Sequence, residues 1–562
     1  MKLSKFLALG IVIFFFSNIV FAQRDLGVRP TETGGVLMYE QAAYDVENYD
    51  ISIRVNPTEK SISGETVVNA KIVMPVNWFV VDLDTPYTVS ETSIVEKNQS
   101  KPLSFERRGG KIWIKFPMTR QTGETVAVKV KYSGVPRVAP RAPWIGGFMW
   151  EKTPDGSPWV ATAVQNDGAD LVFPCKDHPS DKPKTVGVHI TVPQPLYAAT
   201  IGKLQKIDKN SDGTQTFNWF MGTPVSNYEI ALNIAPYKII EDKYKSVAGE
   251  TFPIIFYILP QDYEKGAKLI EETKKYTAFF EKYLGPYPFR AEKLGIAQTP
   301  HLGMEHSTII AYGNNFKYSP EGFDWLMFHE YGHEWWANLV TASDWRDFWI
   351  HEGFQSYMDT LYLEHTKGKE AYLTAMKSRM KATRNMQPVA PRDPKIAYQV
   401  YMAEPDYLRS DGDIYGKGAV VLHTLRYLIG DDAFFRALHR MAYPTKEMEK
   451  LTDGRQTRLV NTDDFLTIAE EESKMKLDWF FELYLRQPKL PKLKVEKAEN
   501  AQGTTINFIW ETPNNLPFEM PIEVNVGNEI KRVKVTNKSG QLIISKGQEF
   551  IIDPNNWILK TE

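Results

Sequence analysis

Two histidines four residues apart, in the run HEYGH at residues 329–333, constrain the fold of this 562-residue chain more than any other pattern. Residues four apart lie on one face of an α-helix, about a turn from each other, so the imidazoles of His329 and His333 can reach one ion. Glu330 sits beside them and can hold a water molecule without being a ligand. The alternative is a helical turn with two unrelated histidines. The run predicts a metal site on a helix.

A catalytic zinc site needs a third protein ligand and an open fourth position. Glu352, in the run WIHEGF at residues 349–354, is the candidate, since it opens a second amphipathic helix. Two antiparallel helices joined by a short connection can bring Glu352 against the histidine pair. His351 is a rival ligand, but it points away if Glu352 faces the first helix. We therefore predict one Zn²⁺ per chain, held by His329, His333 and Glu352.

Residues 1–22 have a different character from the rest of the chain. Lys2 and Lys5 precede an apolar run at residues 6–16, and the small residue Ala22 ends the segment. This is the layout of a secretory signal peptide, and the apolar run is short for a membrane span. We expect cleavage after Ala22 and an exported protein, periplasmic or secreted, with no stable membrane insertion. An uncleaved anchor is the alternative.

The net charge is −2, which predicts no nucleic-acid partner and no strong attraction to acidic membranes. Cys175 is the only cysteine, so no intrachain disulfide can form. It could be a nucleophile, but its place after an apolar run favours a packed structural residue. The sequence does not indicate an oligomeric state.

The chain is too long for one compact core and has the composition of a globular protein, with 43% hydrophobic and 24% charged residues. From about residue 44 to 240 apolar residues alternate at period two, as in β-strands. After Pro260 the spacing of apolar residues becomes that of α-helices, and short alternating strands return beyond Pro491. This predicts an α+β multidomain chain. The expected division is a signal peptide (1–22), an N-terminal β domain (23–248), a mainly helical catalytic domain (249–488) and a small C-terminal β-sandwich (489–562).

The motif HEYGH, eighteen intervening residues and then a glutamate in WIHEGF together resemble the gluzincin zinc aminopeptidases. That family includes the alanyl and leucyl aminopeptidases and the leukotriene hydrolase. Three further segments fit it in the right order: FPCKD at 173–177, GMEH at 303–306 and YGKG at 415–418. The resemblance implies a thermolysin-like catalytic domain in a short, bacterial-type member with a more open cleft than its longer relatives.

The resemblance also implies roles for individual residues. Glu330 would be the general base, and Tyr415 would donate a hydrogen bond to the oxyanion. Glu305 would pair with the free ammonium of a peptide substrate. The remaining candidates for the substrate site are Gly303, Met304, His306 and Gln165. His306 stands where the family usually has Asn, and we expect its protonation to weaken activity in the mid-sixes of pH.

We therefore predict a zinc aminopeptidase that acts on peptides. The alternative with the same metal chemistry is a zinc endopeptidase or a specialised peptidase with altered recognition of the amino terminus. A peptide- or glycan-binding module on an inactive scaffold is the hypothesis from another class. The intact set of Glu330, Tyr415 and three ligands argues against it.

Overall fold

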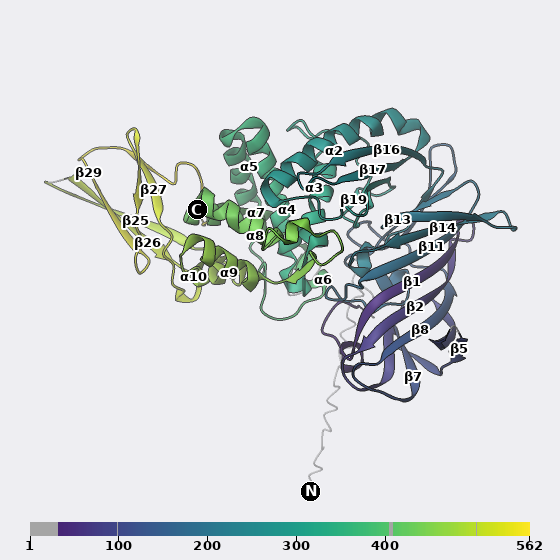
Figure 1. Cartoon of the computed structure of the whole chain (residues 1–562). Helices are drawn as coiled ribbons and strands as arrows, with labels where there is room; N and C mark the ends of the chain where they lie inside the picture. Colours follow the sequence, from purple (N-terminus) through teal and green to yellow (C-terminus); the bar gives the residue numbers. More distant parts are fainter. Residues whose placement is uncertain (1–31, 98, 404–408, 502, 562) are drawn as a thin grey trace, which may run out of the picture.

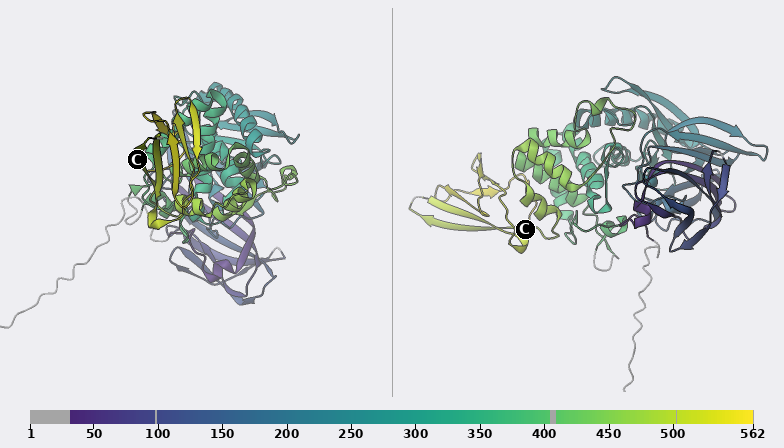
Figure 2. Two further views of the ribbon diagram at one scale, coloured as in Figure 1. Left: turned by 90° about the vertical axis from the view of Figure 1, so that its left-hand side faces the viewer. Right: turned by 60° about the horizontal axis from the view of Figure 1, so that its bottom comes forward.

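The computed structural model describes residues 32–561, apart from residues 98, 404–408 and 502. The expected signal peptide therefore lies outside the described residues. The molecule is elongated: β-sheets from the N-terminal part lie at one end, helices fill the middle, and a second β unit forms the other end (Figures 1 and 2).

The N-terminal part is built on an eight-stranded sheet, where β1 and β11 run parallel and the other neighbours antiparallel. Its strands, in spatial order, are β13 (Lys203–Lys209), β14 (Thr214–Met221), β11 (Thr185–Pro193), β1 (Tyr44–Asn56), β2 (Ser61–Ile72), β8 (Thr125–Gly134), β4 (Thr88–Glu96) and β5 (Gln99–Pro102). In β1 the predicted alternation is observed, since Ile51, Ile53 and Val55 are buried and the residues between them are exposed. One face of the sheet therefore packs on a core.

Two smaller sheets accompany it. One consists of β12 (Tyr197–Ala199), β15 (Asn233–Ala235), β10 (Pro158–Ala163) and β9 (Gly147–Lys152), and the other of β3 (Val76–Asp82), β7 (Lys111–Arg120) and β6 (Phe105–Arg108). Cys175 is fully buried and forms a backbone bridge with Asp82, and burial raises the pKa of its thiol. It has the packing expected of a structural residue.

A five-stranded sheet joins the N-terminal part to the helices, and the sequence did not predict it. Its order is β16 (Lys238–Lys245), β17 (Thr251–Ile258), β18 (Leu294–Gln298), β20 (Ile310–Tyr312) and β19 (Gly303–Met304). Strands β17, β18 and β20 run parallel, and every residue of β18 is buried, so no period-two pattern marks it. The expected domain boundary at residues 248–249 lies in the turn of the β16–β17 hairpin.

Helices dominate the middle of the chain. They are α2 (Tyr263–Leu284), α3 (Trp325–Gly332), the π-helical turn η4 (Glu334–Leu339), α4 (Trp349–Lys367), α5 (Lys369–Ala382), α6 (Ala397–Tyr401), α7 (Gly416–Ile429), α8 (Asp431–Ala442), α9 (Thr462–Ser473) and α10 (Asp478–Leu485). Two short strand pairs, β21 (Val340–Ala342) with β24 (Arg458–Val460) and β22 (Met402–Ala403) with β23 (Arg409–Ser410), lie among them. No helix within the described ranges is long and apolar enough to span a membrane.

The C-terminal part contains two three-stranded sheets. They are β25 (Lys492–Asn500), β26 (Gly503–Glu511) and β29 (Ser539–Ile544), and β28 (Glu529–Val533), β27 (Ile522–Val526) and β30 (Phe550–Ile552). Buried residues of both sheets, such as Trp510 on β26 and Val524 on β27, belong to one apolar cluster. The chain is thus a multidomain α+β protein with β-sheets at both ends.

Candidate functional site

Three ligand-type atoms converge between α3 and α4. His329 lies on α3, His333 directly follows it, and Glu352 lies in the first turn of α4; all three side chains are buried. The Nε2 atoms of the two histidines are 3.3 Å apart, and Oε2 of Glu352 is 3.5 Å from Nε2 of His329 and 3.4 Å from Nε2 of His333. The predicted triad therefore forms a nearly equilateral triangle.

This triangle fits a zinc ion. Ligands about 2.0–2.1 Å from a tetrahedral ion lie roughly 3.3–3.4 Å from one another, which matches the observed separations. Oε2 of Glu352 is buried and accepts no hydrogen bond, so the protein leaves it available for an ion. Two imidazole nitrogens and a carboxylate oxygen are a ligand set that Zn²⁺ prefers.

The other ring nitrogens fix the orientation of the imidazoles. Nδ1 of His329 lies 2.9 Å from a carboxylate oxygen of Asp359, and Nδ1 of His333 lies 2.9 Å from the backbone oxygen of Trp336. Because both partners are acceptors, each Nδ1 carries the proton and each Nε2 presents its lone pair to the centre of the triangle. Asp359 was not among the predicted site residues, although it follows Glu352 by seven residues and so lies on the same face of α4.

Glycines allow the helices to approach closely enough for this arrangement. A Cβ at Gly332 would lie 1.9 Å from the side-chain oxygen of Gln355 on α4. A Cβ at Gly418 on α7 would lie 2.8 Å from Cα of Gly353 on α4, so the two backbones touch there. This contact places Tyr415, the residue before α7, beside Glu352, the residue before Gly353.

Glu330 faces the same cavity without joining the triangle. It is buried, and a Cβ at Gly303 would lie 2.8 Å from its Oε1, so the glycine provides space for the carboxylate. Burial raises the pKa of the Glu330 carboxyl to about 8, and the neighbouring His329 and His333 oppose this rise. The sequence predicted a carboxylate beside the histidine pair and outside the coordination triangle, and Glu330 has this position.

A second carboxylate, Glu305, lies close to the ligand triangle. One of its oxygens lies within 4.8 Å of ligand-type atoms of both Glu330 and His333. Gln165 donates a hydrogen bond to Oε1 of Glu305, and the Tyr228 hydroxyl donates another at 3.1 Å. Burial raises the pKa of the Glu305 carboxyl to about 7. The structure thus brings Gln165 and Glu305 together, although 140 residues separate them.

The residues around Glu305 divide into two groups. Gly303 and Met304 line the cavity with Glu305, but His306 is not among the described residues that line it. His306 is fully buried, and burial lowers the pKa of its imidazole to about 3. An imidazole with this pKa stays neutral in the mid-sixes of pH. This contradicts the expectation that protonation of His306 weakens activity in that range.

Two tyrosines cover the other side of Glu352. The hydroxyls of Tyr401 and Tyr415 are hydrogen-bonded to each other, and the Tyr401 hydroxyl lies 3.5 Å from Oε1 of Glu352. Burial and the Glu352 carboxylate hold the pKa of the Tyr415 hydroxyl well above its usual range, so it remains a donor. Tyr401 was not predicted, because it belongs to none of the motifs.

His351, the rival ligand, points away from the triangle. Its Nε2 accepts a hydrogen bond of 2.9 Å from the backbone nitrogen of Ala342, and burial lowers the pKa of the ring to about 3. Its imidazole is thus hydrogen-bonded to the backbone of β21 and does not reach the triangle. Glu352 is therefore the third member of the ligand set.

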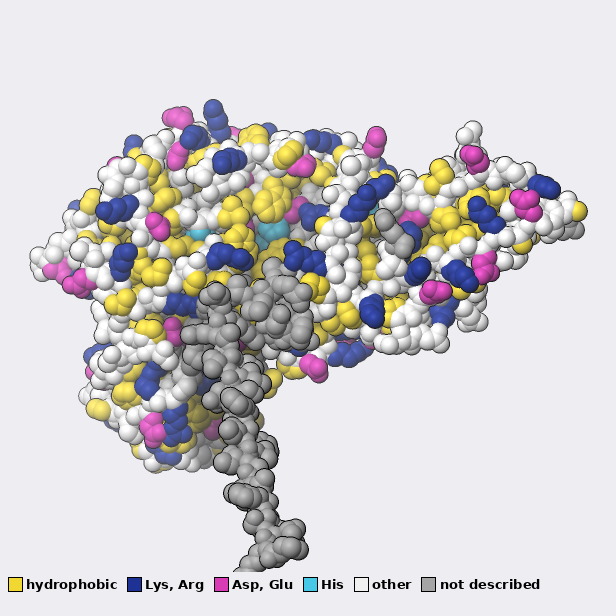
Figure 3. Space-filling view, turned by 180° about the vertical axis from the view of Figure 1, so that it is seen from behind, with side chains coloured by type: hydrophobic (Ala, Val, Ile, Leu, Met, Phe, Trp, Pro, Cys, Tyr) yellow, Lys and Arg dark blue, Asp and Glu magenta, His cyan; other side chains and the backbone are white. Residues whose placement is uncertain are grey.

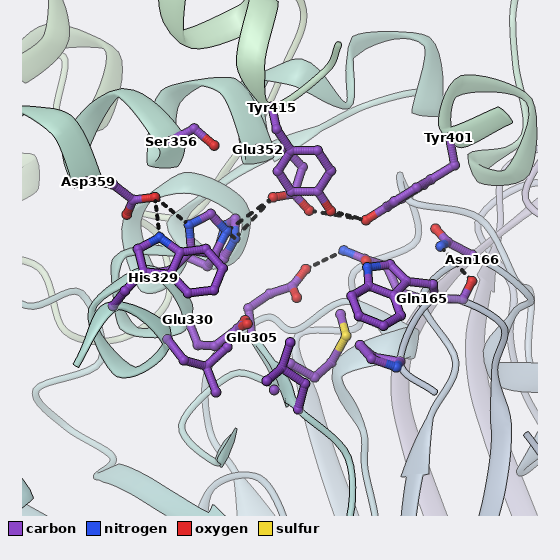
Figure 4. A pocket seen from close by; sticks show the side chains of 18 of the residues that line it. Gln165, Asn166, Glu305, His329, Glu330, Glu352, Ser356, Asp359, Tyr401 and Tyr415 are labelled. Atoms are coloured by element: carbon purple, nitrogen blue, oxygen red, sulfur yellow. Dashed lines mark hydrogen bonds and ion pairs between the residues drawn. The ribbon is translucent and has the colours of Figure 1, made fainter. Parts of the chain in front are cut away.

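The site opens into a cavity of about 290 Å³. The three members of the triangle line it, together with Glu330, Glu305, Gln165, Asp359, Tyr401 and Tyr415, whereas His306, His351 and Tyr228 do not. Figure 4 shows His329 and Glu352 between Asp359 on one side and the tyrosine pair on the other, with Glu305 below Glu352 and Gln165 on the side of Tyr401. From the back of the molecule, histidine side chains are visible in the centre of the surface among hydrophobic and basic residues (Figure 3).

Two models of one peptidase family match the chain. The peptidase M1 N-terminal domain matches residues 45–228, and the peptidase family M1 domain matches residues 268–484. The chain belongs to peptidase family M1. This confirms the resemblance to the gluzincin aminopeptidases and the expectation of a zinc metallopeptidase with Zn²⁺ at the His-His-Glu site.

Curated proteins named as aminopeptidases are similar to the chain over part of their length. Human glutamyl aminopeptidase is 25% identical over 382 residues, which are 65% of this chain and 37% of the relative. A probable aminopeptidase 1 from Saccharolobus solfataricus is 22% identical over 486 residues, 81% of this chain and 56% of the relative. The chain thus spans less than two thirds of the length of these relatives.

Among solved structures, an M1 zinc metallopeptidase mutant from Deinococcus radiodurans with a bound Tyr-Ser-Ala substrate has the same fold. The match has a TM-score of 0.65 and 22% identity, and it covers 83% of this chain and 97% of that one. The M1 fold is therefore shared over most of both molecules.

Proposed function

We propose that this M1 peptidase is an aminopeptidase, which removes residues from the free amino termini of peptides. The observation that carries the proposal is the position of Glu305, a buried carboxylate beside the ligand triangle with Gln165 and Tyr228 as its partners. A substrate ammonium would supply the positive charge that this buried acid lacks. One of its oxygens lies within 4.8 Å of a ring nitrogen of His333, a separation that the ammonium and the carbonyl group of a single residue can bridge.

The chain's own residues then divide the chemistry. Zinc, when bound, acts as a Lewis acid towards the scissile carbonyl and makes water more acidic. Glu330 takes a proton from the attacking water and passes it to the nitrogen of the leaving group. The Tyr415 hydroxyl donates a hydrogen bond to the carbonyl oxygen as negative charge develops there, and Tyr401 holds that hydroxyl in place.

The test compares one peptide with a free and with an acetylated amino terminus. We expect acetylation to lower kcat/KM by at least a hundredfold, because it removes the charged bond and leaves Glu305 buried without a cation. Glu305→Gln should lower cleavage of the free peptide, keep the zinc and narrow the difference between the two substrates. Equal cleavage of both peptides by the wild-type enzyme would instead support the endopeptidase.

We further propose that the protein is exported and that its domains follow the division given above, with the boundary at residues 248–249 moved to the start of β16. The support for export is the layout of residues 1–22. The support for the boundary is the pairing of β16 with β17. A mature protein whose amino-terminal residue is not Gln23 would contradict the expected cleavage site.

A further inference from the structure

A second hollow, of about 470 Å³, adjoins the zinc cavity beyond the tyrosine pair. The two hollows share four lining residues, which are Trp144, Asn166, Tyr401 and Tyr415. We call the second hollow the Trp144 chamber. One wall comes from the N-terminal part of the chain, with Arg141, Trp144 and Ile145, and the other from α6 and its neighbours, with Tyr398 and Met402.

The walls of the Trp144 chamber suit an apolar side chain. Its lining contains three tyrosines, a tryptophan, an isoleucine and a methionine, and no carboxylate is present among the described residues that line it. Trp144 is 40% exposed, so its ring is available to a ligand. Arg141 is exposed, and its guanidinium lies 5.4 Å from the centre of the Trp144 ring, so the chamber carries one positive charge at its edge.

The direction of a bound peptide follows from the position of its amino terminus. Figure 4 shows Asn166 and Tyr401 on one side of Glu305 and Glu352, and Ser356 and Asp359 on the other. Gln165, the partner of Glu305, lies on the side of Asn166 and the Trp144 chamber. A substrate whose ammonium pairs with Glu305 on this side would have its first residue next to the Trp144 chamber. The rest of the peptide would then pass the ligand triangle towards Ser356, which lines the zinc cavity.

We propose that the Trp144 chamber binds the side chain of the substrate's first residue, and that it favours large apolar and aromatic side chains over small and basic ones. This inference rests on the proposed aminopeptidase function and adds the class of substrate. Burial of a large apolar side chain against these walls contributes favourable binding free energy, whereas the methyl group of alanine is too small to fill the chamber. A lysine or arginine side chain meets the charge of Arg141 and finds no carboxylate among the described residues that line the chamber.

The zinc-loaded enzyme is tested on the 4-nitroanilides of alanine, leucine, phenylalanine and arginine. Full burial of a leucine or phenylalanine side chain predicts kcat/KM values roughly 10- to 100-fold above that of alanine. The arginine substrate should fall at least tenfold below leucine. A wild-type enzyme that prefers alanine or arginine would overturn the inference. Cleavage of none of the four would overturn the aminopeptidase function as well.

Two variants separate binding in the chamber from a general structural effect. Trp144→Ala should lower kcat/KM for leucine and phenylalanine tenfold or more and leave alanine nearly unchanged. Arg141→Glu should raise the value for arginine at least tenfold relative to leucine. Arg108→Glu is the matched control, because Arg108 also stacks on a tryptophan, at 5.0 Å from the Trp113 ring, but lies on β6. The proposal would be contradicted if Trp144→Ala lowered kcat/KM equally for all four substrates, or if Arg141→Glu left the ratio of the arginine to the leucine kcat/KM unchanged.

Discussion

Tyr401 and Tyr415 meet at their hydroxyls beside Oε1 of Glu352, the carboxylate oxygen that does not face the histidines. If Tyr415 donates to the developing oxyanion, Tyr415→Phe should lower kcat about 10²- to 10³-fold with little change in KM. Tyr401→Phe should lower kcat less, because Tyr401 acts through Tyr415. Steady-state kinetics and zinc analysis would test this, since neither residue is a metal ligand.

A double variant adds a sharper control. Once Tyr415 is phenylalanine, Tyr401 has no hydroxyl to position, so Tyr401→Phe should cost almost nothing further. If the fold decreases in kcat of the two single variants multiply in the double variant, Tyr401 contacts the substrate itself. Loss of zinc in either single variant would show that the tyrosines support Glu352 instead.

Site residues could be predicted from the sequence where their positions depend on spacing along one helix. The four-residue spacing of His329 and His333 needs only a helix to become a pair of ligands. Asp359 could have been found in the same way, since it is two turns from Glu352. Tyr401 could not have been found in this way, because its position depends on how α6 packs against the rest of the molecule. The contact of His333 with Trp336 could not either, because it uses a backbone oxygen, which every residue has.

At the scale of elements, helices and strands with a clear apolar period could be predicted from the sequence, whereas fully buried strands could not. The helical period that begins after Pro260 corresponds to α2, which spans Tyr263–Leu284. The helix predicted for the run HEYGH is α3, which ends within that run at Gly332, and the backbone leaves helical geometry at Trp336 and Ala337. This break turns the oxygen of Trp336 towards His333. Strand β18 was missed because a fully buried strand has no alternation to detect.

The crossing of α4 and α7 gives a prediction for Gly418. Gly418→Ala would place a methyl group 2.8 Å from Cα of Gly353, so the two helices must move apart. Overpacking of this kind costs about 1–3 kcal/mol in the free energy of unfolding. Because Tyr415 and Glu352 flank the crossing, we also expect a lower kcat.

Gly416→Ala is the matched control, since a Cβ there meets nothing within 4 Å and it lies on the same helix. It should leave kcat near the wild-type value and not lower stability. Urea unfolding and kinetics of both variants would check this. Equal behaviour of the two alanine variants would mean that the close crossing is not needed for the site.

At the scale of the whole molecule, the site depends on parts far apart in the sequence. The N-terminal part supplies Gln165, and its Lys182 donates hydrogen bonds to the backbone oxygen of Asn338 and the hydroxyl of Thr341 in the middle part. The end of the chain packs on α7, where Trp557 stacks on His423 with ring centres 4.5 Å apart. Such contacts join segments that no local pattern relates, so the sequence could not predict them.

His423 makes the stability of this assembly depend on pH. Burial lowers the pKa of its imidazole to about 3, whereas an unfolded histidine titrates near ~6.5. Between these values the unfolded chain binds a proton that the folded chain does not, so His423 lowers stability as the pH falls through this range. Burial raises the pKa of Glu229 to about 8 and of Glu334 to about 7, and these carboxyls act in the opposite direction. The wild-type curve alone therefore cannot isolate the histidine.

The difference between the wild-type protein and His423→Gln isolates it, because the opposing carboxyls and the loss of zinc in acid affect both proteins. From pH 6 to pH 4 the wild-type free energy of unfolding should fall relative to that of the variant by about 1.4 kcal/mol per pH unit. Between pH 7 and pH 8 the difference should stay constant, because the imidazole is neutral in both states. Urea unfolding at each pH gives both values. A difference that does not change between pH 6 and pH 4 would show that His423 already binds its proton in the folded protein, and that its contact with Trp557 is open to water.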